Sequence, residues 1–349
     1  MKVDTSSIEK ILSKARKVAL TGHFNPDGDS VGSVVGMHHY LSARGIDSTM
    51  ILPSEFPASL GFLNPAGKDG QITVYKENPD KALKAISEAD VIICLDFNRF
   101  SRTEFLEDAL RESHAKKILI DHHLSPEKDE FDVVISKTDI SSACELLFWT
   151  LMDMPDIAGD PGRLSMPCVN ALYVGMMTDT NNFSNSCFPS TFMMASLLLE
   201  RGVDKTRLQE KVLQCYTIPR TRLMGHLLKD KIIYYKDLHA TCMTLSNKEK
   251  KAHRFEPGDS EGFVNLPLAV KSVKISALFT ENGDGQYIRV SLRSKGKTDV
   301  NGLARRFFNG GGHKNAAGGR LYMHLEDVPA YYEKSLREYF SIQKNQNLF

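Results

Sequence analysis

Three short, mainly apolar runs in the N-terminal part of the chain each end within two residues of an acidic or histidine side chain. The runs 17–21, 91–95 and 118–120 precede, in that order, a polar turn, Asp96 and Asp121. Continuous apolar runs that alternate with amphipathic segments are typical of parallel strands buried on both faces of a sheet. Because such strands end at one edge, where open α/β sheets bind ligands, we expect a doubly wound, mostly parallel α/β sheet with a polar site at that edge.

The turn after the first run combines one histidine with two aspartates. His23, Asp27 and Asp29 lie within nine residues that also contain Pro26 and Gly28. Proline restricts the backbone and glycine permits unusual dihedral angles, so the turn can direct the three side chains at one point. A turn that only caps the next helix is the alternative, but capping explains one aspartate and not the whole set. We therefore interpret the turn as part of a metal site.

Two further groups extend this hypothesis. The triplet Asp121-His122-His123 follows the third run, and Asp179 follows a helix expected at about 164–177. Taken singly, each could be an ordinary polar loop. Carboxylates with one imidazole per ion suit manganese or magnesium better than zinc, which prefers thiolates. The other histidines have no acidic or cysteine partners at ligand spacing.

Strand-like runs resume after residue 228, which predicts a first domain over 1–228 that carries the candidate metal site and a smaller α/β domain over 229–349. The second domain contains Gly310-Gly311-Gly312-His313, where glycine N–H groups and a following helix N-terminus would suit phosphate. A plain turn is the alternative. Between residues 285 and 320 there are eight Lys or Arg residues and one acid. This local positive charge favours phosphorylated substrates.

Composition narrows the class of protein. The 349 residues are 42% hydrophobic and 25% charged, enough for two cores. A net charge of +1 argues against binding of long nucleic acid, which needs excess Lys and Arg. Six cysteines without a CxxC pair indicate reduced thiols packed as small apolar residues. Neither a signal peptide nor a membrane-spanning run is predicted, so we expect a cytoplasmic protein.

The ordered set of motifs resembles the DHH phosphoesterase family with its DHH-associated C-terminal domain, over nearly the whole chain. The bacterial nanoRNase and pAp phosphatase branch is the most similar in length and layout. The resemblance implies a hydrolase with two divalent ions, usually Mn²⁺. Its substrates would be very short oligoribonucleotides, cleaved to 5′-mononucleotides, with 3′-phosphoadenosine 5′-phosphate (pAp) as a further candidate. The resemblance is compatible with a homodimer.

The resemblance also implies roles for individual residues. One ion would be held by His23, Asp27 and Asp96, and the other by Asp29, Asp96, His122 and Asp179. Two ions roughly 3.5–4 Å apart can stabilise the attacking and leaving oxygens at phosphorus. His123 would hydrogen-bond a phosphate oxygen or the leaving group, and Asp121 would orient His122 or complete the hydrogen-bond network.

Further positions would contact substrate. In the second domain, Arg293 in the segment that begins at Ser291, together with His313 and Gly310, Gly311 and Gly312, match the family's substrate-contacting region. One departure from the family pattern is the bulky, basic stretch 97–102 after Asp96. Within it, Arg99 or Arg102 either reaches a substrate phosphate or caps a helix.

Three alternative functions remain at this point. A phosphodiesterase of cyclic or linear dinucleotide second messengers would use the same site. A catalytically silent nucleotide-binding module belongs to another class, and is disfavoured because every acid and imidazole of the metal set is present. An inorganic pyrophosphatase would fit the basic glycine loop.

Overall fold

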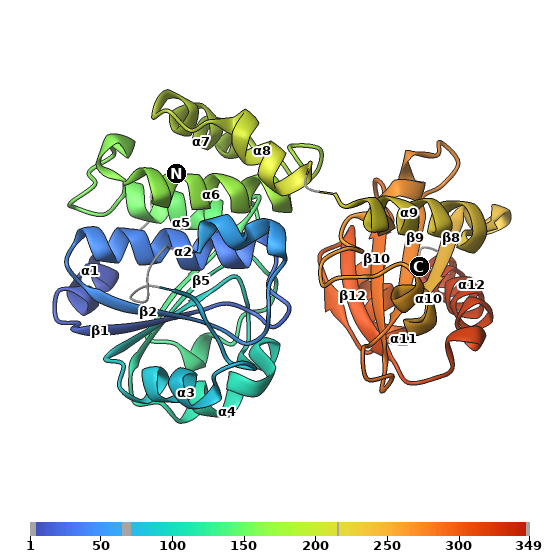
Figure 1. Cartoon of the computed structure of the whole chain (residues 1–349), viewed down its shortest axis with the longest axis horizontal. Coiled ribbons are helices and arrows are strands. Elements are labelled where there is room, and N and C mark those ends of the chain that lie inside the picture. The colour runs from blue at the N-terminus through green and yellow to red at the C-terminus, as the bar shows by residue number, and fades with distance from the viewer. Residues whose placement is uncertain (1–4, 65–70, 215, 347–349) are drawn as a thin grey trace. The chain divides into compact units, whose positions relative to one another are not determined.

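The computed structural model describes residues 5–64, 71–214 and 216–346, with side chains described up to residue 341. The chain forms two compact units, Met1–Cys215 and Tyr216–Phe349. Each unit has its own sheet and its own hydrophobic core (Figure 1).

Unit 1 is built on a six-stranded sheet in which every neighbouring pair is parallel, with the order β3-β2-β1-β4-β5-β6. The strands are β1 (Lys17–Thr21), β2 (Asp47–Leu52), β3 (Thr73–Val74), β4 (Val91–Leu95), β5 (Lys116–Asp121) and β6 (Val133–Ser136). The predicted doubly wound sheet is therefore confirmed. The strand order reverses between β1 and β4, and the crevice beside such a reversal is where open sheets bind ligands.

Helices cover both faces of this sheet (Figure 1). One face carries α1 (Ser6–Leu12), α2 (Gly28–Ala43), α5 (Ala143–Met152) and α6 (Met166–Asp179), and the other carries α3 (Pro79–Ser87) and α4 (Glu107–Glu112). An outer layer, α7 (Pro189–Glu200) and α8 (Lys205–Leu213), packs on α6. Alternate strand residues such as Leu20 and Ala19 enter the two different cores, which explains why the strand sequences are apolar throughout.

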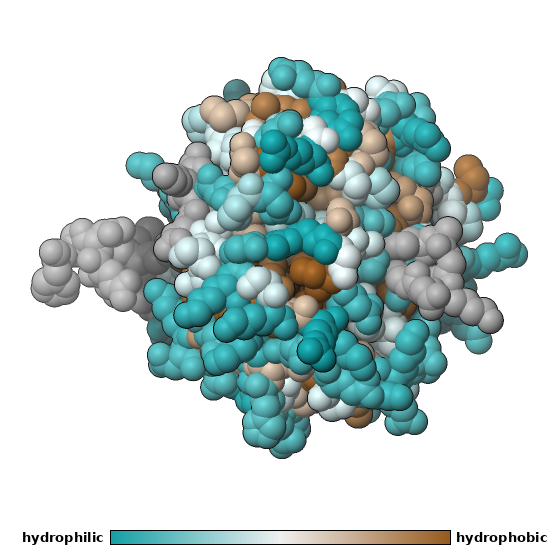
Figure 2. All heavy atoms as spheres, turned by 90° about the vertical axis from the view of Figure 1, so that its left-hand side faces the viewer, coloured by the Kyte–Doolittle hydropathy of each residue, from teal (hydrophilic) through white to brown (hydrophobic). Residues whose placement is uncertain are grey.

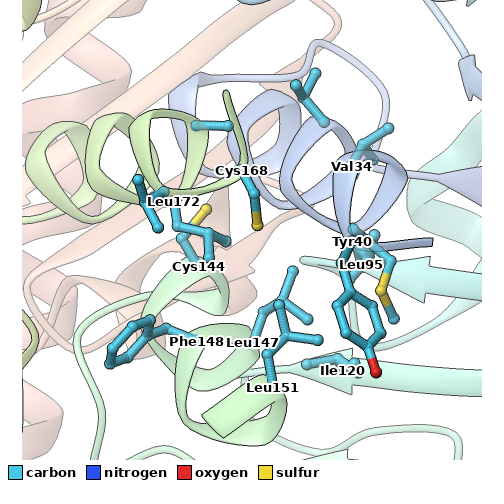
Figure 3. Packing of buried hydrophobic residues seen from close by; sticks show 14 of the residues in the cluster. Val34, Tyr40, Leu95, Ile120, Cys144, Leu147, Phe148, Leu151, Cys168 and Leu172 are labelled. Carbon is cyan, nitrogen blue, oxygen red and sulfur yellow. The ribbon is translucent and has the colours of Figure 1, made fainter. Parts of the chain in front are cut away.

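Helices α2 and α6 pack closely because glycines lie at their crossing. A Cβ atom on Gly32 would be 2.6 Å from the carbonyl oxygen of Ala171, so α2 can approach α6 only without a side chain there. Around this contact, Cys144 of α5 and Cys168 of α6 turn into the shared interior (Figure 3). Their thiols are free and buried, as the sequence predicts for small apolar packing residues. Cys215 lies outside the described residues.

Unit 2 contains a mixed sheet of order β11-β12-β10-β9-β8-β7. Among the described strand pairs of this sheet, β8 and β9 are parallel and the other neighbours are antiparallel. The strands are β7 (Ile233–Tyr235), β8 (Ala240–Leu245), β9 (Ile275–Glu281), β10 (Ile288–Ser294), β11 (Gly311–Gly312) and β12 (Ala316–Leu321). One face packs against α11 (Val300–Phe307) and α12 (Val328–Gln346). The other packs against α9 (Ile218–His226) and the 3₁₀ segment Phe263–Ala269, while α10 (Asn247–Ala252) follows β8.

The division between the units falls earlier than the boundary expected at residue 228. Helix α9 is part of unit 2, because Leu223 and the following Leu227 pack in one cluster with Met243 of β8 and Phe263. The sequence pattern of α9 is amphipathic, like that of the helices before it. Only the long-range contacts with β8 reveal to which core this helix belongs.

Three local expectations are corrected by the structure. The segment after Gly310 is not a helix but the hairpin of β11 and β12, in which Gly312 has φ +147 and a Cβ there would meet the Ala316 oxygen at 2.6 Å. Asp179 is the last residue of α6 rather than a residue beyond it. The sequence pattern at 103–113 predicts a single helix, but the structure has a 3₁₀ segment, Phe100–Leu106, followed by the shorter α4.

The surface shown in Figure 2 is covered mainly by hydrophilic residues, and hydrophobic residues appear there in small separate groups. Among the described residues, none of the helices combines the length and the apolar character needed to cross a bilayer.

The glycine contact between α2 and α6 generates a stability prediction. Replacement of Gly32 by alanine should lower the free energy of unfolding of unit 1 by about 1–3 kcal/mol, because the added methyl group overpacks the helix crossing. Trp149 is the chain's one tryptophan and is buried in α5, so its fluorescence during urea denaturation reports unit 1. Gly61→Ala is the control, since nothing lies within 4 Å of its added Cβ. Equal stability of the two variants would contradict the packing argument.

Candidate metal centre

The carboxyl ends of β1, β4 and β5 and the end of α6 bring six of the predicted residues of unit 1 together. His23 and Asp27 follow β1, Asp96 follows β4, and His122 follows β5. Asp29 lies in the first turn of α2, and Asp179 ends α6. This is the crevice beside the reversal of strand order, so the topology explains why residues far apart in the sequence converge here.

The first group consists of His23, Asp27 and Asp96. The Nε2 atom of His23 is 3.3 Å from Oδ2 of Asp96 and 3.8 Å from Oδ1 of Asp27. The other ring nitrogen, Nδ1, is 2.9 Å from the carbonyl oxygen of Phe24 and donates its hydrogen there. Nε2 is thus left facing the carboxylates, as in a metal-binding histidine.

Asp27 serves the fold as well as this group. Its Oδ1 atom accepts hydrogen bonds from the backbone nitrogens of Asp29, at 3.0 Å, and Ser30, at 3.1 Å, and so caps α2. The capping interpretation and the ligand interpretation of this aspartate are therefore compatible. The cap holds the carboxylate in place beside His23.

The second group surrounds His122. Its Nε2 atom lies 3.5 Å from Oδ1 of Asp96, 3.5 Å from Oδ2 of Asp179 and 3.8 Å from Oδ2 of Asp29. Potential ligand atoms of His122, Asp29 and Asp96 all lie within 4.8 Å of one another, and those of the first group do so as well. Asp96 belongs to both groups, the position expected of a bridging ligand.

The N-terminus of α5 fixes Asp29. Its two carboxylate oxygens accept hydrogen bonds from the backbone nitrogens of Ala143, at 2.6 Å, and Cys144, at 2.9 Å. The helix start is itself secured by Glu145, which is fully buried and accepts from Ser141 and from Thr191 Oγ1 at 2.7 Å. Sequence reasoning missed Glu145, although its spacing from the cap Ser142 is that of a capping box.

Asp96 shows two signs of a ligand-binding residue. It has φ +63, in the left-handed region that residues other than glycine rarely occupy, and it is 2% exposed. Its Oδ1 atom is buried and has no hydrogen-bond partner among the residues that the structure describes. Buried acceptors are normally paired, so this oxygen is available to a cation. The set of carboxylate oxygens and imidazole nitrogens therefore fits divalent ions such as Mn²⁺ or Mg²⁺.

The pKa values of these groups reflect the excess of carboxylates over positive charges at the site. Burial raises the pKa of Asp29 well above its usual value, and repulsion from Asp96 and Asp179 adds to this. Burial lowers the pKa of His122, but its carboxylate neighbours outweigh this effect and raise it to about 10. Burial and the charge of Arg102 lower the pKa of His23, yet its partner carboxylates raise it to about 9. These pKa shifts reflect repulsion among the carboxylates, and bound cations would relieve that repulsion.

The rest of the triplet forms a chain of polar contacts beside the two groups. Asp121 is fully buried and accepts from the backbone nitrogen of His123, at 3.0 Å, and from its Nδ1 atom, at 2.7 Å. Nη1 of Arg102 lies 3.0 Å from Nε2 of His123. Arg99 is half-buried, and its carbonyl oxygen accepts from the Arg102 backbone nitrogen at 3.1 Å. Of the two arginines after Asp96, Arg102 is the one whose side chain contacts the triplet in the described contacts.

A cavity of about 400 Å³ adjoins His123. It is lined by His123, Ser125, Pro126, Lys128, Val134, Ser136 and Thr138, at the carboxyl ends of β5 and β6. The lining offers hydroxyl groups and one ammonium group beside the candidate metal centre.

The predicted substrate-contacting residues of unit 2 lie on and beside its sheet. Ser291 and Arg293 occupy alternate positions of β10 and share its half-exposed face. The N–H groups of Gly310, Gly312 and His313 donate to Ala304 O, Asn301 Oδ1 and Ala316 O inside unit 2. The glycines therefore serve close strand packing, and these N–H groups do not form the phosphate nest expected from the sequence.

Sequence comparison identifies two family domains in the chain. Residues 17–176 match the DHH family, N-terminal domain, and residues 240–338 match the DHHA1 domain. The first match covers the sheet of unit 1 and all candidate metal ligands except Asp179. The second covers β8 to β12 and most of α12 of unit 2.

Individual relatives agree with these matches. A protein of Streptococcus mutans called probable bifunctional oligoribonuclease and PAP phosphatase NrnA is 27% identical over 94% of this chain and 98% of its own length. The cyclic-di-AMP phosphodiesterase GdpP of Bacillus subtilis is 25% identical over 97% of this chain, which corresponds to 50% of that protein.

A solved structure resembles the whole chain. An exopolyphosphatase-related protein from Bacteroides fragilis superposes with a TM-score of 0.87 at 38% identity, covering 97% of this chain and 96% of that one. Together with the order of motifs at the metal centre, these matches show that the chain belongs to the DHH family of phosphoesterases and carries a DHHA1 domain as its second unit.

Proposed function

We propose that this hydrolase cleaves very short oligoribonucleotides to 5′-mononucleotides and also removes the 3′-phosphate of pAp. The observation that carries the proposal is Asp96, a strained and buried carboxylate shared between two groups of potential metal ligands. The oligoribonuclease and PAP phosphatase of Streptococcus mutans matches over nearly its whole length, which supports the choice of substrate.

The proposed ligands divide between two Mn²⁺ ions. His23, Asp27 and Asp96 would hold one, and Asp29, Asp96, His122 and Asp179 the other. When bound, such a pair activates water and stabilises charge on the oxygens of the phosphate that reacts. The chain's own residues set this arrangement in advance, because the α2 cap fixes Asp27 and the α5 N-terminus fixes Asp29.

Unit 2 is the proposed substrate-binding unit. Arg293 and Ser291 on the half-exposed face of β10, with His313 in the adjacent hairpin, would grip a second phosphate of the substrate. A guanidinium group binds phosphate oxygens through paired hydrogen bonds. The free thiols support a reducing, cytoplasmic setting.

The second candidate is a cyclic-dinucleotide phosphodiesterase, favoured by the similarity to GdpP. That relative is twice as long as the matched region, whereas the NrnA match extends over almost all of both proteins. The length agreement makes cyclic dinucleotides the weaker candidate.

The first prediction from this proposed function concerns substrate choice. With Mn²⁺, linear diribonucleotides and pAp should be hydrolysed faster than cyclic dinucleotides, pyrophosphate or 20-residue RNA, as followed by ion-exchange chromatography of the products. Faster cleavage of cyclic dinucleotides would favour the second candidate. Nucleotide binding without any hydrolysis would instead indicate a silent binding module.

The second prediction concerns the shared carboxylate. Asp96→Asn should lower kcat/KM by at least about a thousandfold and reduce bound Mn²⁺, because both ligand groups lose a charged member. Metal content is measured by plasma mass spectrometry after desalting. Asp108→Asn, the same change at an exposed position of α4, should alter neither quantity. Full Mn²⁺ occupancy in the Asp96 variant would refute the bridging assignment.

The third prediction concerns the grip in unit 2. Arg293→Ala should raise KM for a dinucleotide by about 10- to 100-fold, the loss expected for charge-assisted hydrogen bonds to phosphate, and leave bound Mn²⁺ unchanged. Arg289→Ala removes an equal charge four residues away on the same strand, so it separates a specific contact from a general field effect. Similar KM values for the two variants would assign the effect to charge alone.

A further inference from the structure

Arg102 places a positive charge directly beside the candidate metal centre. Its Nη1 atom is 3.0 Å from Nε2 of His123, which directly follows the candidate ligand His122. No carboxylate pairs with Arg102 in the part of the chain that the structure describes. An arginine beside a cluster of acids but not paired with one has donors available for an anion.

The contacts of His123 determine which of its nitrogens carries the hydrogen. The carboxylate of Asp121 can only accept, so Nδ1 of His123 donates to it at 2.7 Å. The guanidinium group of Arg102 can only donate, so Nε2 of His123 accepts from it. In this arrangement His123 is neutral and has no hydrogen on Nε2 to give to a phosphate oxygen or a leaving group.

The backbone holds Arg102 at this place. Its carbonyl oxygen accepts from the backbone nitrogen of Phe24 at 2.8 Å, which ties the segment after β4 to the turn that carries His23. On either side, Phe100 is fully buried, and Glu104 has φ +52, a conformation rare outside glycine. The loops of two metal-ligand motifs therefore fix the position of one arginine.

We propose that Arg102 binds the reacting phosphate at the metal centre, and that His123, supported by Asp121, positions its guanidinium group. With Nη1 engaged by His123, the remaining N–H groups can still pair with phosphate oxygens. The arginine would stabilise the negative charge that grows on these oxygens during hydrolysis. Arg102 is then the catalytic residue of this pair, and His123 is a positioning residue.

This inference rests on the proposed function and assigns a new role within the same site. It changes the role expected for His123, from a donor that touches substrate to a support for the group that does. It also accounts for the basic stretch after Asp96, for which the sequence predicts either phosphate binding or helix capping.

The test compares Arg102→Gln, His123→Gln and the double variant, with kcat and KM measured on a diribonucleotide and on pAp. Arg102→Gln should lower kcat by about 100- to 1000-fold, the loss typical for removal of one donor to a developing oxyanion. Bound Mn²⁺ should stay at the wild-type level. Because His123 acts through Arg102, the double variant should be no slower than Arg102→Gln alone.

Two further measurements distinguish a direct role from a structural one. Added guanidinium chloride, at concentrations that leave the fold intact, should restore activity to Arg102→Gly but not to His123→Gly. Nitrogen-15 NMR of the wild type should find the hydrogen of His123 on Nδ1. Arg163→Gln, at an exposed position of unit 1, serves as the control and should keep full activity.

Several results would overturn the inference. If the fold-losses in kcat of the two single variants multiply in the double variant, His123 acts independently of Arg102. If Arg102→Gln keeps the wild-type kcat/KM, Arg102 does not contact substrate. If the wild type cleaves the diribonucleotide and pAp and Arg102→Gln cleaves them equally fast, the proposed function stands and only the role of Arg102 is refuted. If no substrate is cleaved, calorimetry of pAp binding with Ca²⁺ still decides the matter, because Arg102→Gln should lose at least tenfold in affinity.

Discussion

Mutual repulsion among buried carboxylates is the constraint on which the rest of this site depends. Asp29 and Asp96 are both almost fully buried. Asp179 lies close to the imidazole of His122, which both of them also approach. Such a cluster is costly in an interior of low polarity unless positive charge or hydrogen bonds compensate it. Backbone N–H groups compensate Asp29 in part, and His23 and His122 compensate Asp96. The remaining deficit explains why the donor set is suited to divalent cations.

The same contacts that build the hydrophobic core also hold this unfavourable cluster together. Helix α2 carries Asp29, helix α6 ends in Asp179, and the two cross at Gly32, where a side chain would separate them. Helix α5 packs against both and presents its first N–H groups to Asp29. Close packing of three helices therefore sets the spacing of ligands that would otherwise move apart. The energy that holds the site comes from burial of apolar surface beneath it.

The strands of unit 1 and its candidate metal ligands could be predicted, because buried parallel strands are continuously apolar and chemistry follows their ends. Features set by distant contacts could not. The glycines at 310–312 are typical of a phosphate loop as well as a tight hairpin, and only the approach of Ala316 and Gly318 distinguishes the two. Glu145 acts through α5 on a residue more than 100 positions away. The membership of α9 in unit 2 likewise depends on its contacts with β8.

The residues of the Asp-His-His triplet contact different partners because they lie at the end of a strand. Successive residues there project in different directions, so neighbouring histidines can serve different partners. The rings of His122 and His123 are 4.7 Å apart and inclined by 70°, and one faces the shared carboxylates while the other bridges Asp121 and Arg102. Three consecutive residues thus connect a cluster that attracts cations to an arginine that attracts anions. A phosphate ester that reacts over metal ions needs both, and this strand end supplies them side by side.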